Sequence, residues 1–192
     1  MKQLTIVYFI IGIALLSCSS TNKNTASPVN KSFEKIIQVN SSAQLKGALE
    51  NAKPGDEIVL ADGIYMGNFK INNDVSGTST KSILLRGSRN AILDGGTIST
   101  GYVLHLKASY WIIKGITIKN GLKGIMTDEA KHNIIDSVKV FDIGEEGIHL
   151  RRFSKHNIIQ NCEVLNTGLK TPDYGEGIYV GTAVSNWAKS SD

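Results

Sequence analysis

The stretch WIIKGITIKN, residues 111–120, has two near copies further along the chain: NIIDSVKVFD at 133–142 and NIIQNCEVLN at 157–166. The step from Ile112 to Ile134 is 22 residues (134 − 112), and the step from Ile134 to Ile158 is 24 residues (158 − 134). A period of about 20–50 residues is typical of a solenoid, in which each repeat is one structural unit stacked on the next. The repeat therefore predicts the fold class before any other feature is considered.

Each copy has the pattern of a short strand, a turn and a second short strand. Apolar residues two positions apart lie on one face of a strand, and they recur as Ile116 and Ile118, Val138 and Val140, and Cys162 and Val164. Turn-prone residues follow at Asn120, Asp142 and Asn166, and a second strand opens with Gly-Ile at residues 124, 147 and 177. β-branched residues dominate and helical spacing is absent, so we expect coils of strands with like residues in ladders: Ile125 on Ile148 on Ile178, and Val138 on Cys162.

The segment before the repeats predicts a helical cap for the first coil. A strand is expected at 36–39, and Ser41 followed by Gln44 has the spacing of a capping box. One helical face is then apolar, and it consists of Leu45, Ala48, Leu49 and Ala52. Weaker strand signals follow at 57–60, 82–87, 91–96 and 102–106. We therefore predict an all-β parallel β-helix over residues 33–192, with an N-terminal cap at 33–56 and coils at 57–186.

The first residues predict export. Lys2 precedes an apolar run from Leu4 to Leu16, and the sequence LLSC that ends at Cys18 has the form of a bacterial lipobox. Residues 1–18 are therefore predicted to be a lipoprotein signal, which attaches the protein to the cell envelope through a lipid on Cys18, at the outer membrane or the cell surface. An ordinary signal peptide and a short membrane anchor are the alternatives, although the run is shorter than the ~20 residues of a spanning helix. Residues 19–32 are polar and are predicted to be a flexible tether.

The charge and the cysteine count limit the partners that the chain can have. There are 21 Lys and Arg against 17 Asp and Glu, a formal charge of +4, and removal of residues 1–17 takes away Lys2 and leaves +3. This excess is too small to favour nucleic acid, and no cluster of aromatic and basic residues points to it. With Cys18 lipidated, Cys162 has no partner for a disulfide, and its place in an apolar ladder predicts a buried role. We expect a monomer.

The C-terminal end of the sequence shows no second amphipathic cap. The last Gly-Ile strand ends about one turn before Asp192, and Trp187 is the last large apolar residue. An uncovered coil would expose strand edges and apolar ladder residues. We therefore expect a truncated member of its class, with C-terminal coils missing. In the competing interpretation, residues 183–192 or another chain cover the end.

Taken together, these features resemble the right-handed parallel β-helix, pectate lyase-like superfamily. The resemblance rests on QLKGAL at 44–49, PGDEIVL at 54–60 and DGIY at 62–65, together with the Asn-Ile-Ile and Gly-Ile repeats, and it covers residues 36–186. It implies an exported protein that acts on an acidic polysaccharide. Many members of such families are calcium-dependent lyases, while others are hydrolases, epimerases or binding proteins, so the resemblance is specific for the fold and not for the reaction.

The Gly-Ile strands are the best place to look for a site, because alternate residues on them point away from the core. Aligned on Ile125, Ile148 and Ile178, the outward positions are Met126, His149 and Tyr179, followed two residues later by Asp128 and Arg151. The third repeat has an insertion at residues 169–176, and insertions of this kind tend to lie on the binding face. His132 and His156 hold equivalent positions before Asn, which predicts packing at a turn, and we assign no role to His105.

Uronate β-elimination needs a neutralised carboxylate and a base, and calcium needs several oxygen ligands. The resemblance and the outward positions together give three groups of candidates. The predicted catalytic residues are His149, Arg151, Arg152 and Lys155. The predicted substrate-binding residues are Tyr174, Tyr179 and Asp128. The predicted calcium ligands are Glu145, Glu146, Asp173 and Glu176.

Several alternatives stay open at this stage. Charged residues beside solenoid turns are often only a solvated face, and a non-catalytic carbohydrate-binding β-helix and an inactive fragment are alternatives to the lyase. An inverting glycoside hydrolase needs two carboxylates about 6.5–9.5 Å apart. Glu146 and Glu176 are predicted to lie on neighbouring strands about 5 Å apart, which counts against that pair.

Overall fold

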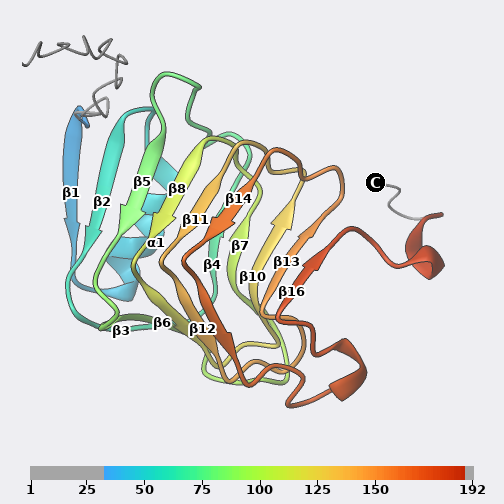
Figure 1. Cartoon of the computed structure of the whole chain (residues 1–192). Helices are drawn as coiled ribbons and strands as arrows, with labels where there is room; N and C mark the ends of the chain where they lie inside the picture. Colours follow the sequence, from blue (N-terminus) through green and yellow to red (C-terminus); the bar gives the residue numbers. More distant parts are fainter. Residues whose placement is uncertain (1–32, 189–192) are drawn as a thin grey trace, which may run out of the picture. The chain divides into compact units, whose positions relative to one another are not determined.

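The computed structural model describes residues 33–188, which wind into a parallel β-helix of five coils, each contributing one strand to each of three parallel sheets (Figure 1). One further strand, β1, precedes the first coil and gives sheet A its sixth strand. Sheet A consists of β1 (Lys35–Val39), β2 (Asp56–Leu60), β5 (Ile83–Arg86), β8 (Trp111–Lys114), β11 (Ile134–Asp136) and β14 (Ile158–Gln160). Sheet B consists of β3 (Gly63–Met66), β6 (Ala91–Asp94), β9 (Thr117–Lys119), β12 (Lys139–Phe141) and β15 (Glu163–Leu165). Sheet C consists of β4 (Phe69–Ile71), β7 (Tyr102–Leu106), β10 (Lys123–Asp128), β13 (Ile148–Arg151) and β16 (Ile178–Val180). The predicted lipoprotein signal and tether, residues 1–32, lie outside the described residues.

The repeat register predicted from the sequence is confirmed by the strand pairing. Ile112, Ile134 and Ile158 are partners in sheet A, and Ile125, Ile148 and Ile178 are partners in sheet C. The inward side chains of the three sheets form one buried core, because a single coil cannot cover its own apolar face and stacked coils can. Cys162 is a half-buried free thiol packed against this core, and burial raises its pKa.

The predicted cap is the helix α1 (Ser42–Asn51), which packs against β1, β3 and β4. The Ser41 side chain accepts a hydrogen bond from the Gln44 backbone N–H, as the capping box requires, while the Gln44 side chain accepts one from the N–H of Asn40. Leu45, Ala48 and Leu49 are buried. Because this apolar face covers the first coil, the sheets begin on a closed end of the core.

The corners of the coils are marked by residues with left-handed backbone. Three aligned columns have positive φ: Gly115, Ser137 and Asn161; Asn120, Asp142 and Asn166; and Tyr110, His132 and His156. The second column confirms the turns that were predicted from its Asn and Asp residues. In the third column the rings stack, with centroids 4.9 Å apart between Tyr110 and His132 and 4.8 Å apart between His132 and His156, so the predicted turn packing of the two histidines is confirmed.

The fifth coil leaves its apolar ladder residues partly open to solvent. Ile158, Leu165 and Ile178 are each close to half exposed, and Val180 is 69% exposed. The short 3₁₀ helix η2 (Val184–Asn186) follows β16, with Trp187 also exposed. Within residues 33–188, no helix has the length and apolar character needed to cross a membrane.

Candidate active site

A pocket of about 390 Å³ opens on the outer face of sheet C, beside β13, β16 and the loop that joins β15 to β16. Ile148 belongs to the core, so its neighbours in β13 point to the opposite face. Most of the residues predicted for a site line this pocket: His149, Arg151, Arg152, Tyr174, Tyr179, Glu145, Glu146, Asp173 and Glu176. Lys155 does not line it, and its backbone forms an isolated parallel bridge with that of Lys131.

The inserted loop of the third repeat forms one wall of the pocket and is held to the coil before it. Backbone N–H groups of Gly168, Leu169 and Lys170 donate to carbonyls of Glu145, Ile143 and Gly144. The short 3₁₀ helix η1 (Pro172–Tyr174) then turns the chain back toward β16. These bonds fix the base of the loop, so Asp173, Tyr174 and Glu176 are presented to the pocket from an anchored segment.

Glu146 is the centre of a buried charged cluster at the base of the pocket. Lys123 pairs with Glu146, and its Nζ also lies 2.7 Å from Oε2 of Glu145. Burial alone would raise the pKa of Glu146, but His149 and Lys123 outweigh it and lower that pKa from 4.5 to about 2. Glu146 is therefore ionised at neutral pH. A glycosidase general acid must hold a proton there, so Glu146 is unsuited to that role.

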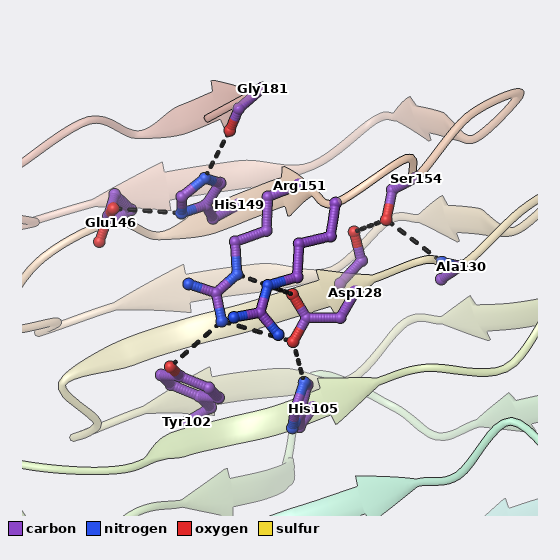
Figure 2. A network of polar contacts seen from close by, with 11 residues as sticks. Tyr102, His105, Asp128, Ala130, Glu146, His149, Arg151, Ser154 and Gly181 are labelled. Carbon is purple, nitrogen blue, oxygen red and sulfur yellow. Dashed lines mark hydrogen bonds and ion pairs between the residues drawn. The ribbon is translucent and has the colours of Figure 1, made fainter. Parts of the chain in front are cut away.

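Both ring nitrogens of His149 face acceptors (Figure 2). Nε2 lies 2.9 Å from the carbonyl oxygen of Gly181, and Nδ1 lies 3.1 Å from Oε1 of Glu146, an ion-pair contact without the alignment of a hydrogen bond. Only the doubly protonated imidazolium can donate to both acceptors. The ring also packs against Tyr179, with centroids 4.5 Å apart. His149 is thus placed to support Tyr179 and leaves neither nitrogen open to the pocket.

Asp128 lies at the C-terminal end of β10, where it meets side chains from the strands on both sides (Figure 2). Its Oδ2 is 2.7 Å from Nε2 of His105 in β7, and its Oδ1 is 2.7 Å from Nε of Arg151 in β13. The side chain is only 4% exposed. Burial would raise the pKa of Asp128, but the hydrogen bonds from His105 and Arg151 outweigh it and hold that pKa well below its usual range. Asp128 was predicted to bind substrate, and the structure instead places it beneath the surface.

The two arginines differ in how freely they can reach a ligand. Arg151 is half-buried, and besides its contact with Asp128 its guanidinium lies 3.4 Å from the hydroxyl of Tyr102. Burial would lower the pKa of Arg151, but the hydrogen bond and the charge of Asp128 outweigh it and raise that pKa. Arg152 is exposed, lines the pocket and approaches Oδ1 of Asp128 only at 3.8 Å. Its backbone is left-handed, with φ of 51°, like that of the aligned Glu129 in the coil before it. Arg152 is therefore the guanidinium that is best able to receive a carboxylate.

Sequence reasoning missed part of this arrangement. Lys123, Tyr102 and His105 were given no role, yet they complete the charged clusters around Glu146 and Asp128. Lys123 and Tyr102 are register partners three positions before the outward row of His105 and Met126. Val103 and Leu104 are both buried, so the alternation is interrupted between Tyr102 and His105, and a strict period of two does not place Tyr102 on the outer face.

The predicted calcium ligands all line the pocket, but they do not form a metal site. Residues 33–188 contain no group of three or more His, Cys, Asp or Glu side chains arranged to hold a metal ion. Lys123 already pairs with both Glu145 and Glu146, whereas calcium needs several oxygen ligands free to coordinate it. The described residues therefore do not fit the ion, and no step proposed below depends on it.

Comparison with known proteins agrees with this geometry. The family described as "Pel9A-like, right handed beta helix region" matches residues 26–176. The chain belongs to this family. The coils are accordingly those of a right-handed β-helix, and the expected membership of the pectate lyase-like superfamily is confirmed.

Two solved structures and one curated protein are similar to this family member. The alginate lyase from Paenibacillus sp. str. FPU-7 is 43% identical, with a TM-score of 0.78 over 81% of this chain and 53% of its own. The pectate lyase Pel9A, at 17% identity and a TM-score of 0.62 over 72% of this chain and 42% of its own, shares the fold. Pectate lyase L of Paenibacillus polymyxa (strain SC2) is 30% identical over 118 residues, 57% of this chain and 26% of its own length. The chain thus spans about half or less of each of these proteins.

Proposed function

We propose that this chain carries the catalytic face of a polysaccharide lyase that cleaves an acidic, uronate-containing polymer by β-elimination, with alginate as the first substrate to test. The observation that carries the proposal is the pocket on sheet C, where the exposed guanidinium of Arg152 lies beside an anchored charge cluster and two tyrosines. The 43% identity to an alginate lyase supports the choice of alginate. The 30% identity to a pectate lyase makes polygalacturonate the second polymer.

The elimination needs a group that stabilises the carboxylate, a base that takes the proton, and an acid that gives a proton to the leaving glycosidic oxygen as its bond to the uronate breaks, and the pocket offers residues for these roles. Removal of the proton next to the uronate carboxylate builds negative charge on that carboxylate, which Arg152 and Arg151 stabilise as guanidinium donors. Tyr179 is the acid–base candidate, because tyrosine is one of the side chains that transfer protons in enzymes and its ring is held against His149. Tyr174, which is exposed on the loop, supplies an aromatic surface for a sugar ring.

The proposal is tested by following the ultraviolet absorbance of the unsaturated product from alginate and from polygalacturonate. Arg152→Ala should lower kcat/KM by about 100-fold, the usual loss for one donor to developing negative charge. The matched control is Arg89→Ala, which removes the same charge from an exposed residue outside the pocket and should leave the rate unchanged. Reducing ends released without unsaturated product would show a hydrolase instead.

Two tyrosine variants separate the acid–base role from stacking. Tyr179→Phe keeps the ring against His149 and removes the hydroxyl, so it should lower kcat by about 100-fold or more, in line with the loss of a general acid–base group. Tyr174→Phe also keeps its ring and should leave kcat near the wild-type value. If the wild-type chain binds alginate oligomers but yields no unsaturated product, it is a carbohydrate-binding module and the lyase proposal is overturned.

The same proposal includes export and attachment to the cell envelope through a lipid on Cys18, as the lipobox predicts. A lipid on Cys18 would attach the protein to a membrane of the cell envelope. Cys18→Ser should move the expressed protein from the membrane fraction to the soluble fraction. A wild-type protein found entirely in the soluble fraction would contradict this part of the proposal.

A further inference from the structure

We propose that Asp128 is a positioning residue that sets the orientation of Arg151 and Arg152 for the substrate carboxylate, rather than a residue that touches the substrate. The inference rests on the proposed function, because it concerns how that site holds its guanidinium groups. It assigns to the buried carboxylate a role in catalysis that acts through its neighbours.

The contacts of Asp128 explain why it cannot serve as a binding group itself. Oδ1 faces Nε of Arg151 at 2.7 Å and Nε of Arg152 at 3.8 Å, while Oδ2 faces Nε2 of His105 at 2.7 Å and the terminal guanidinium nitrogen of Arg151 at 3.4 Å. Both oxygens are therefore occupied by donors from the neighbouring strands. A carboxylate that is also 4% exposed presents no acceptor to a sugar.

The same contacts fix the direction in which Arg151 points. Asp128 and Arg151 are direct register partners on β10 and β13, so the carboxylate lies beside the arginine stem and holds its Nε edge. The Nη2 of Arg151 that faces Oδ2 of Asp128 also donates to the Tyr102 hydroxyl, which lies 3.4 Å away, and the Tyr102 ring centroid lies 5.8 Å from the guanidinium carbon. An arginine held by both neighbours loses little further side-chain entropy when it binds a carboxylate, and this is how a rigid surrounding shell improves a site.

The backbone beyond β13 adds a second restraint on Arg152. Left-handed backbone occurs at two successive non-glycine residues, Arg152 and Phe153, with φ of 51° and 61°. The Ser154 hydroxyl lies 3.0 Å from that of Thr127 and accepts a hydrogen bond from the N–H of Ala130. This unfavourable turn is tied to the preceding coil, so Asp128 acts on an arginine whose backbone is already held in place.

Charge and position predict opposite results when Asp128 is changed, and this makes the inference testable. Asp128→Asn removes a negative charge next to two arginines, so a purely electrostatic role predicts tighter binding of a polyanion and no loss of rate. A positioning role predicts a lower kcat, because an amide has only one acceptor and its NH₂ would face a donor. Misplacement of a catalytic group by about 1 Å costs about 100-fold in rate.

The experiment measures kcat and KM of the full chain on alginate for Asp128→Asn, Asp128→Glu and the control Asp136→Asn. Asp128→Asn should lower kcat by about 10- to 100-fold without raising KM. Asp128→Glu keeps the charge but displaces the carboxylate by one methylene, so it should also lower kcat. This second variant tests the inference even if Asp128→Asn does not fold, which the absence of cooperative unfolding would show. Asp136→Asn removes the same charge from a carboxylate in sheet A, bonded to Asn161, and should change neither constant. Wild-type kcat in a folded Asp128 variant would overturn the inference.

A spectroscopic readout separates failure of this inference from failure of the proposed function. In the wild type, the Nε–H signals of Arg151 and Arg152 in nitrogen-15 spectra should be resolved and slow to exchange, and both should shift when alginate oligomers are added. In Asp128→Asn the Arg151 signal should exchange faster and lose its distinct shift. A wild type that yields no product would overturn the lyase proposal alone. Identical arginine signals in the wild type and the variant would overturn the positioning role alone.

Discussion

Because Glu146 is ionised in the charged cluster under the pocket, the free energy of unfolding at low pH reports on that cluster. The pKa of Glu146 is lowered from 4.5 to about 2 in the folded chain, so the ionised form is stabilised by folding. A lowered carboxyl pKa contributes stability that is present above the unfolded pKa and is lost as the pH falls toward the folded value. We therefore expect the free energy of unfolding to decrease between about pH 4.5 and pH 2, as measured by urea titrations across this range.

In the variant Glu146→Gln, the free energy of unfolding should depend less on pH over this range, because the titrating carboxyl group is absent. The variant should also be less stable at neutral pH, because Lys123 and His149 lose the carboxylate that they face. Glu163→Gln is the control, since Glu163 is a half-exposed partner of Lys139 and surface pairs contribute about 0–1 kcal/mol. An unchanged acid profile in Glu146→Gln would contradict the proposed cause.

Sequence reasoning placed individual residues well where the period-two alternation was strong. Arg151, His149 and Tyr179 were assigned to the outer face because Ile148 and Ile178 fixed the phase of their strands, and the structure confirms that they line one pocket. The partners were not predictable in the same way. The pairing of His105 with Asp128 depends on the register of β7, whose sequence lacks the Gly-Ile signature of β10, β13 and β16. The choice of partner is a tertiary contact that alternation does not encode.

At the scale of the element, the turn after β8 depends on a glycine. Gly115 has φ of 78°, and a Cβ there would lie 2.4 Å from the carbonyl oxygen of Gly87. Gly115→Ala should therefore destabilise the chain by more than the ~1 kcal/mol expected from left-handed backbone alone. Gly47→Ala is the matched control, because Gly47 lies inside α1 and a Cβ added there would have nothing within 4 Å, so it should stabilise the chain by about 0.5–1 kcal/mol.

Thermal and urea unfolding of the two glycine variants measure the difference directly. The aligned corner positions Ser137 and Asn161 hold the same left-handed conformation without glycine, so φ alone does not require glycine there. The close approach of Gly87 is what distinguishes Gly115. Equal stability of Gly115→Ala and the wild type would show that the two coils can separate at this corner without loss.

Elements with strong local signals were predictable, and elements defined by their neighbours were less so. The start of α1 directly after Ser41 was predictable, because the residues that form the cap and the apolar face are close together in the sequence. By contrast, Tyr110 was not recognised as a corner residue, because a tyrosine with φ of 60° has no local signature. Only its stacking on His132 shows that the column begins one coil earlier.

At the scale of the whole molecule, the predicted need for calcium can be tested on stability as well as on rate. The carboxylates of Glu145 and Glu146 both pair with Lys123, so an ion would have to displace that ammonium group. We therefore expect the melting temperature of the chain to be the same in calcium chloride and in a chelator. A rise in melting temperature with calcium, which reports binding to the folded state, would restore the predicted site among the pocket carboxylates.

The outer face of sheet C carries the pocket and a second, separate cavity, and we predict from this a preference for long substrates. One outward ladder position runs through Lys70, His105, Met126, His149 and Tyr179 in successive strands, with Met126 fully buried. A cavity of about 200 Å³ lies at the far end of this row, lined in part by Lys70, Tyr102 and His105. Strands about 4.8 Å apart place the two ends roughly 19 Å from each other.

Oligomers long enough to span this row should therefore have a lower KM than short ones, because only they reach Lys70, which is exposed on β4. Lys70→Gln should raise KM for long alginate oligomers several-fold, as expected for loss of a charge-assisted contact of about 1 kcal/mol, and should leave KM for the shortest cleaved oligomer unchanged. High salt should have the same selective effect, since exposed charges are screened. An equal change for long and short oligomers would mean that the polymer does not follow sheet C, and that the second cavity takes no part in binding.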